Sequence, residues 1–173
     1  MSAPSDPASL ASLAARVAES LRERGQTVGV IEDSAGGLVS AALLAIPGVS
    51  AYFIGGAVIY TRQASKALLG LTADDVAGMR TETEPYAKLA ASKIRDKLGT
   101  TWGLSESGAS GPTGSRYGDL PGHVCLAVVG PNAKSRTIET GLSDRLANMD
   151  IFARQLLALF DEALKEQHPL PPS

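Results

Sequence analysis

Three residues in one short stretch have side chains that can carry out hydrolysis together: the hydroxyl of Ser50, the phenol of Tyr60 and the amine of Lys66. A serine hydroxyl becomes a nucleophile when a neighbouring base takes its proton, and a desolvated lysine or a phenolate can act as that base. Each residue also has a purely structural explanation: Ser50 as a helix cap, Tyr60 as a half-buried strand residue, and Lys66 as a solvated helix residue. Both explanations stay open, because spacing alone does not show that the three side chains meet.

A second group of candidates lies in a turn between a predicted strand and a predicted helix. The apolar run 28–31 predicts a buried strand, and residues 38–44 have a helical pattern. A turn at this point directs free backbone N–H groups to the mouth of a sheet, where a phosphate can bind. The candidate binding residues are Ser34, Ala35, Gly36 and Gly37. The alternative is a tight turn in which the glycines supply positive φ angles and Ser34, with Asp33, simply favours a turn.

A glycine-rich loop, residues 108–114, follows another predicted strand at 102–107. If this strand and 28–31 are neighbours in one sheet, the loop and the first turn face one crevice at its carboxyl edge. The candidate binding residues of the loop are Gly108, Ser110 and Gly111. Glu106 is either a buried carboxylate that orients a ligand or an exposed edge residue. No Gly-Lys-Ser/Thr sequence follows either segment, so nucleoside triphosphate hydrolysis at a P-loop is not supported.

These segments require a scaffold of alternating helices and strands. Further predicted elements are a helix from Pro7, capped by Asp6, to Gly25; a strand at 51–60 with either a bulge or a close backbone approach; and short helices at 63–69 and 72–75. A helix at 83–98, a hairpin of strands at 123–130 and 134–140, and a long last helix capped by Ser143 follow. This order predicts a single-domain α/β fold, residues 7–166, in which helices flank a mixed β-sheet. Residues 1–6 and 167–173 are predicted to be flexible tails.

Composition narrows the function classes. A hydrophobic share of 44% and a charged share of 20% are ordinary for a globular protein, and a net charge of −2 gives no case for nucleic-acid binding. One cysteine and two histidines are too few for a zinc site of nitrogen and sulfur ligands, so no metal is expected. The sequence has no apolar run of membrane-spanning length and no signal-peptide pattern at its start. A cytoplasmic protein without membrane contact is therefore expected.

Four motifs, in this order, resemble the C-terminal domain of the CinA family. They are Glu-Asp-Ser-Ala-Gly-Gly at 32–37, Pro-Gly-Val-Ser-Ala-Tyr-Phe at 47–53, Val-Ile-Tyr-Thr at 58–61 and Ser-Gly-Ala-Ser-Gly-Pro at 107–112. The resemblance covers nearly the whole chain. It implies an α/β fold, a homo-oligomer and a small-molecule site without a metal or cofactor. The family includes nicotinamide mononucleotide (NMN) deamidases, which convert the carboxamide of NMN to the nicotinate form and release ammonia.

The resemblance also implies roles for single residues. Ser50 aligns with the second serine of the family motif Gly-Ser-Ser-Ala-x-Phe and would be the nucleophile. Tyr60 aligns with the tyrosine of the motif Thr-Tyr-Ser-Asn and would manage protons, together with Lys66 if a local shift gives Lys66 the role of the family lysine. The glycines of the two glycine-bearing segments would hold the nucleotide, with their N–H groups facing its phosphate or the oxyanion.

The chain departs from the family pattern at several positions, among them Ala35, which replaces a threonine. Asp33 replaces the serine of the family motif Glu-Ser-Cys-Thr-Gly-Gly, and Met149 replaces an arginine of the last helix. Ser65 aligns with the family lysine, so that Lys66 is displaced by one residue, or about 100° around a helix. These departures indicate a divergent branch. We expect an amidohydrolase acting on NMN or a related pyridine nucleotide; the alternatives are a nucleotide-binding protein without catalysis and a structural, partner-binding subunit.

Overall fold

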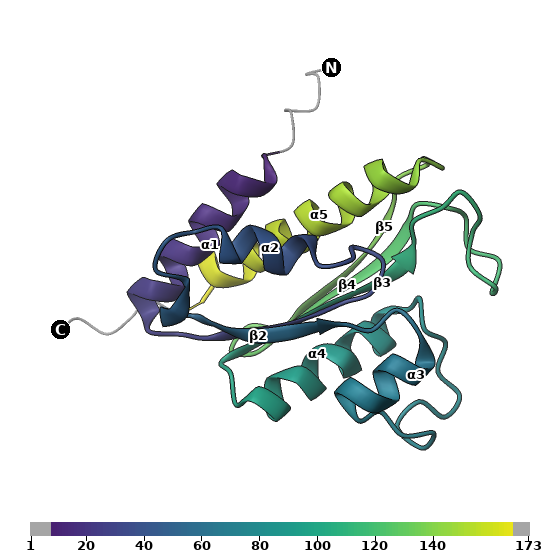
Figure 1. Ribbon diagram of the computed structural model, residues 1–173, viewed down its shortest axis with the longest axis horizontal. Helices are drawn as coiled ribbons and strands as arrows, with labels where there is room; N and C mark the ends of the chain where they lie inside the picture. The colour runs from purple at the N-terminus through teal and green to yellow at the C-terminus, as the bar shows by residue number, and fades with distance from the viewer. Residues whose placement is uncertain (1–7, 168–173) are drawn as a thin grey trace.

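A five-stranded mixed sheet separates two layers of helices (Figure 1). The computed structural model describes residues 8–167. Its strands are β1 (Val28–Glu32), β2 (Phe53–Val58), β3 (Trp102–Ala109), β4 (His123–Val129) and β5 (Lys134–Glu139). Their order is β2-β1-β3-β4-β5, with β1 parallel to both neighbours and the remaining pairs antiparallel. The predicted mixed sheet is confirmed. The predicted flexible tails, except Gln167, lie outside the described residues.

The helices divide between the two faces of this sheet. On one face lie α1 (Leu10–Arg24), α2 (Leu38–Leu44) and α5 (Arg145–Lys165). On the other lie α4 (Glu84–Leu98) and the short α3 (Arg62–Ala64), which continues as a π-helical turn, Ser65–Leu69. Among the described residues, no helix is both long enough and apolar enough to cross a membrane.

Alternating strand residues supply the two cores. Val30 packs into the cluster formed with α1, α2 and α5, whereas the adjacent Ile31 packs into the cluster on the α4 face. This alternation follows from the two-residue period of a strand. In the first cluster, Trp102 of β3 meets Phe160 of α5 edge to face, with ring centroids 5.3 Å apart. The sheet is therefore covered on both sides, and its strand ends are left to form sites.

The ends of several elements differ from the prediction. The N-cap of α1 is Ser9, and the predicted cap Asp6 lies outside the described residues. The N-cap of α5 is Asp144 rather than Ser143, because its side chain accepts a 2.8 Å hydrogen bond from Ala147 N. Residues 72–75 form a turn and not a helix: Thr72 and Asp75 exchange two side-chain-to-backbone hydrogen bonds of 2.9 and 3.1 Å that close it.

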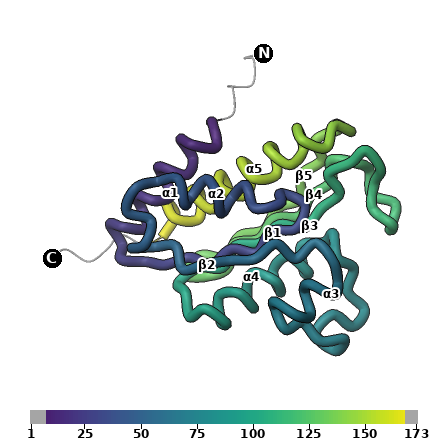
Figure 2. The backbone as a smooth tube through the Cα atoms, viewed as in Figure 1, coloured from purple at the N-terminus to yellow at the C-terminus, as the bar shows by residue number. Residues whose placement is uncertain are grey.

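The central parallel strands position the candidate site. β1 lies between β2 and β3, as Figure 2 traces, so all three strands end at the same edge of the sheet. The predicted neighbourhood of the first and third strands is thereby confirmed. The predicted bulge is also present: the register of β1 with β2 shifts between Val28 and Gly29, so that Gly29 pairs with Gly55.

Candidate active site

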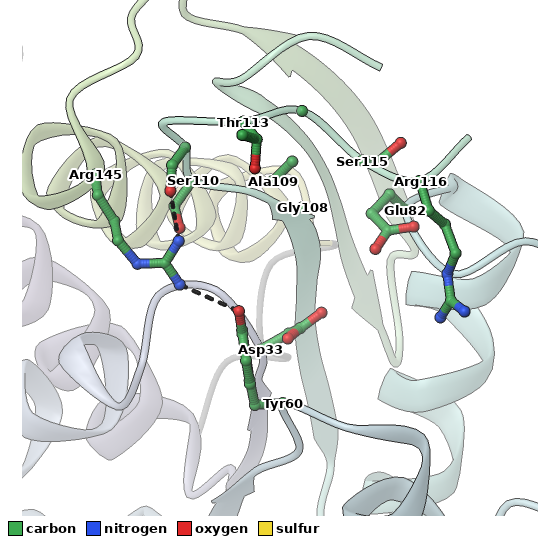
Figure 3. A pocket seen from close by; sticks show the side chains of 12 residues that line it. Asp33, Tyr60, Glu82, Gly108, Ala109, Ser110, Thr113, Ser115, Arg116 and Arg145 are labelled. Carbon is green, nitrogen blue, oxygen red and sulfur yellow. Dashed lines mark hydrogen bonds between the residues drawn. The ribbon is translucent and has the colours of Figure 1, made fainter. Parts of the chain in front are cut away.

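A cavity of about 280 Å³ opens where β1, β2 and β3 end (Figure 3). Asp33 follows β1 directly, Tyr60 lies two residues beyond β2, and Arg145 is the first residue of α5. The remaining lining residues are Glu82, Arg116 and most of the segment from Gly108 to Ser115. Figure 3 shows the two arginines on opposite sides of the cavity, with Asp33 and Tyr60 side by side at its third wall. Acid–base groups and anion-binding groups thus share one enclosed space.

Arg145 links two walls of this cavity. Its guanidinium donates one hydrogen bond to the carbonyl oxygen of Gly111 (2.5 Å) and another to the phenol oxygen of Tyr60 (3.2 Å), both drawn in Figure 3. Because Asp144 caps α5 next to it, the backbone of Arg145 is fixed by the first helical turn. The side chain therefore holds Tyr60 against the glycine-rich loop.

Asp33 is the acid–base group of the cavity. Its desolvation by burial, together with the nearby carboxylate of Glu106, raises its pKa to about 8. The hydroxyl of Ser107 opposes this effect by donating a hydrogen bond to its Oδ2 at 3.2 Å. A carboxyl group with such a pKa exchanges its proton near neutral pH, which is the range a general acid or base needs.

Glu106 is buried, as in the first of its two predicted alternatives. Its carboxylate, however, is bound by groups of the protein itself. Its Oε1 accepts hydrogen bonds from the N–H groups of Asp33 (2.5 Å) and Ala35 (2.8 Å), and its Oε2 accepts one from Ser34 Oγ (2.7 Å). Burial raises its pKa to about 7, although all three hydrogen bonds act in the opposite direction. Glu106 therefore fixes the turn after β1, and it does not line the cavity.

Glu32 occupies one further N–H group of this turn and two at the start of α2. Its carboxylate accepts hydrogen bonds from the N–H groups of Gly37 (3.2 Å), Val39 (2.9 Å) and Ser40 (2.9 Å) and so closes the start of α2. Ala35 and Gly37 therefore have no N–H to offer a phosphate, and none of residues 34–37 lines the cavity. Gly36 and Gly37 instead form the tight turn of the alternative explanation, with positive φ angles of 68° and 102°.

The glycine-rich loop fits the predicted role better. Within the described residues, the N–H groups of Gly111, Thr113 and Gly114 donate no hydrogen bond to the protein, and all three residues line the cavity. Ser110 also lines it, and its buried hydroxyl has no partner. Asn148 of α5 holds the loop by donating to the carbonyl oxygen of Ser110 at 2.8 Å. A ligand oxygen can therefore be bound here without displacing a bond of the fold.

Ser50 and Lys66 lie away from this cavity. Ser50 is exposed in the 3₁₀ turn Val49–Ala51 that precedes β2, whereas Tyr60 follows the same strand. A six-residue strand is about 20 Å long, so one chain does not bring these two side chains together. Lys66 lines a second cavity, beyond α3. The neighbouring Ser65 is buried and donates to the carbonyl oxygen of Arg62 at 3.1 Å.

Four charged side chains of the cavity were not among the predicted site residues: Asp33, Glu82, Arg116 and Arg145. The sequence marks Asp33 as a turn residue and as a departure from the family pattern, and its place directly after a buried strand is a further signal for a site at the strand end. The sequence Asp144-Arg145 signals a capped helix start. Glu82 and Arg116 lie in irregular segments, where no periodic pattern marks them. Met149, another departure from the family pattern, packs beside the glycine turn: a Cβ built on Gly36 would lie 2.9 Å from its Cε.

A family model described as the CinA C-terminal domain matches residues 10–164. The chain belongs to this family. CinA-like proteins from Prochlorococcus marinus (strain MIT 9313) and Myxococcus xanthus (strain DK1622) are 39% identical over 121 residues and 36% identical over 140 residues. These alignments cover 70% and 81% of the chain but 28% and 33% of the relatives, so the chain spans about a third of the length of these CinA-like proteins.

Solved structures of the CinA superfamily share the whole fold. The competence damage-inducible protein A (ComA) from Klebsiella pneumoniae subsp. pneumoniae MGH 78578 superposes with a TM-score of 0.87 at 25% identity, covering 93% of this chain and 100% of that one. The competence/damage inducible protein CihA from Agrobacterium tumefaciens gives a TM-score of 0.84 at 25% identity, covering 96% and 100%. The predicted CinA fold is confirmed.

Proposed function

We propose that this protein hydrolyses the carboxamide of NMN, or of a closely related pyridine nucleotide, to the carboxylic acid and ammonia. The observation that supports this most is the single cavity shared by Asp33, Tyr60, Arg145 and the glycine-rich loop. Membership of the CinA C-terminal domain family agrees with a site of this kind. We also propose that the active form of the protein is a homo-oligomer.

Binding uses the cationic and glycine-rich walls. The phosphate of the nucleotide would accept hydrogen bonds from the N–H groups of Gly111, Thr113 and Gly114 and interact with Arg116. Arg145 already gives two of its N–H groups to the protein, so we assign it the task of holding Tyr60 and the loop in place. The carboxamide would then lie against Asp33 and Tyr60.

Hydrolysis uses Asp33. In its ionised form, the carboxylate takes a proton from a water molecule, whose oxygen adds to the carboxamide carbon. The phenol of Tyr60 stabilises the oxyanion by donating a hydrogen bond. The protonated Asp33 then gives its proton to the amide nitrogen, the C–N bond breaks, and ammonia leaves. The serine that the family pattern has at position 33 is replaced here by a group that can act as a base.

Ser50 has a place in this mechanism only in a different arrangement. Because it lies at the opposite end of β2 from Tyr60, a second copy of the chain would have to supply it. The experiment is ammonia release from NMN by the purified protein, compared with Asp33→Asn and Ser50→Ala. Loss of turnover in Asp33→Asn alone would support the assignment, and loss in Ser50→Ala would move the nucleophile to a shared site.

A second candidate function is nucleotide binding without catalysis. It is favoured by one observation: Ser50 and Lys66, two of the three residues to which the family pattern assigns catalysis, both lie outside the cavity. The same experiment separates the two functions. Saturable binding of NMN by a folded protein that releases no ammonia would establish this second function and overturn the first.

A further inference from the structure

The proposed active site is the first of three adjoining cavities. The cavity at the strand ends shares Asp33, Tyr60, Glu82 and Arg116 with an adjoining cavity of about 250 Å³. That second cavity shares Arg62, Thr81 and Tyr86 with a third, of about 570 Å³, which lies against α3 and the segment that follows it. We call these three spaces the active-site cavity, the passage and the distal cavity. The shared residues show that the three spaces adjoin in sequence, so a ligand longer than a mononucleotide would follow this order from the first to the third.

The distal cavity has an apolar interior. Leu71, Val76, Met79 and Tyr86 line it, and Leu71 and Tyr86 are buried in the core on the α4 face. The ring of Tyr117 stands at its edge, where Arg80 lies over it at 4.6 Å and Arg62 donates to its phenol oxygen at 3.3 Å. An apolar space bordered by a fixed aromatic ring suits a flat heteroaromatic group, such as a nucleobase.

Cations without carboxylate partners border the passage and the distal cavity. Among the residues that the structure describes, Arg62, Lys66 and Arg116 form no ion pair, whereas Arg80 at the same rim is paired with Asp119 at 3.1 Å. Arg62 lines both spaces, and Arg116 lines both the passage and the active-site cavity. Cations without a direct ion-pair partner, placed between two binding spaces, are suited to the phosphates that join two halves of a ligand, although Asp33 and Glu82 line the passage beside them.

We propose that the distal cavity is a second nucleotide subsite, which binds the nucleoside half of a pyridine dinucleotide. In this arrangement the pyridine ring lies in the active-site cavity and its phosphate stays between the glycine-rich loop and Arg116. The second phosphate lies in the passage beside Arg62, and the second base lies against Met79 and Tyr86. This inference rests on the proposed function, because it takes the pyridine ring to lie beside Asp33. It extends the ligand class from mononucleotides to dinucleotides.

The test is calorimetric titration of the whole protein with NMN, AMP and NAD. We expect NAD to bind at least about tenfold more tightly than NMN, because charge-assisted contacts of the second half add to those of the first. AMP is expected to compete with NAD and to bind together with NMN. Equal affinities for NAD and NMN, or competition between AMP and NMN for one site, would overturn the subsite.

A charge reversal at the rim tests the same proposal without disturbing the core. Lys66 is exposed, and Lys66→Glu is expected to remove the tenfold advantage of NAD while leaving the affinity for NMN unchanged. The matched control is Lys97→Glu, an exposed position near the far end of α4 that lines none of the three spaces. An unchanged NAD affinity in Lys66→Glu would contradict the proposal.

The outcomes also separate this inference from the proposed function. Tight NAD binding with no ammonia release from NMN would keep the subsite and overturn the hydrolysis. Ammonia release from NMN without any preference for NAD would keep the hydrolysis and overturn the subsite. A folded protein that binds none of the three nucleotides would overturn both.

Discussion

The guanidinium of Arg145 donates a hydrogen bond to the phenol oxygen of Tyr60 across 3.2 Å, although the two residues are 85 positions apart in the chain. One follows β2 and the other begins α5, so this contact joins the edge of the sheet to the helical layer above it. A second bond from the same guanidinium holds the loop after β3. Arg145 therefore joins two walls of the cavity, while Asn148 holds the same loop at Ser110.

Replacing Arg145 should weaken substrate binding and catalysis together. Arg145→Gln removes the fork that holds both Tyr60 and Gly111, and we expect kcat/KM for NMN to fall about tenfold to a hundredfold. The control is Arg154→Gln, which removes an arginine of the same helix whose partner is Asp150, one turn away. Equal activity of the two variants would show that Arg145 does not organise the site.

The rate of hydrolysis should depend on the ionisation of Asp33. Because burial and Glu106 raise the pKa of this carboxyl group to about 8, the general base is mostly protonated at neutral pH. We expect kcat/KM to rise with pH up to about 8 and then to level off. A pH profile of ammonia release measures this, and a rate that is flat between pH of about 6 and 9 would exclude Asp33 as the base.

Asp33 should also make the folded protein less stable as the pH rises. Its pKa is about 8 in the fold against 3.8 in an exposed chain, so the folded state keeps a proton that the unfolded state loses. Stability is then highest below the unfolded pKa and falls as the pH rises toward about 8. Asp33→Asn should flatten this dependence and give a higher Tm than the parent protein at a pH of about 9. Asp96→Asn, at an exposed position of α4, is the control.

Replacing Ser50 should have little effect on turnover. Ser50 is exposed before β2, at the opposite end of this strand from the cavity, so we expect Ser50→Ala to change kcat less than about twofold. If turnover is lost instead, the site must include a second copy of the chain. Ammonia release measures this directly. A mixture of inactive Ser50→Ala and inactive Asp33→Asn that regained activity would identify the shared site.

Glu32 should be a structural residue and not a catalytic one. Its buried carboxylate accepts three backbone N–H groups, and Glu32→Gln replaces a charged acceptor by a neutral one with a single oxygen. We expect a loss of about 2 kcal/mol in the free energy of unfolding, measured as a lower urea midpoint at an unchanged m value. Glu23→Gln, exposed on α1, should leave the midpoint in place.

Local patterns predicted most of the scaffold. Some signals depend only on residues close together in the chain, so they can be recognised from the sequence alone. They are the apolar runs of β1 and β4, the apolar stripe of α5 and the glycine that ends α4. The turn at 72–75 was mistaken for a helix because Thr72 and Asp75 have the spacing of a helix cap. Here the two residues satisfy each other's N–H groups, and no helix follows.

The site was harder to predict because its contacts are long-range. Glu106 is 71 residues from Ala35, yet it takes the N–H that the turn was expected to offer a phosphate. Ser50 and Tyr60 are close in sequence, but an intervening strand separates them. Conversely, Asp33 and Arg145 reach one cavity only because α5 packs against β3, the strand beside β1. No local pattern encodes these relationships.

The central claim is that Asp33 carries out amide hydrolysis in the cavity at the strand ends. The most direct test is ammonia release from NMN by the purified parent protein, with Asp33→Asn and Arg154→Gln assayed at equal concentration after both are shown to be folded. The account predicts turnover by the parent protein and by Arg154→Gln, and a loss of at least about a hundredfold in Asp33→Asn. Full turnover by Asp33→Asn, or none by the folded parent protein, would contradict it.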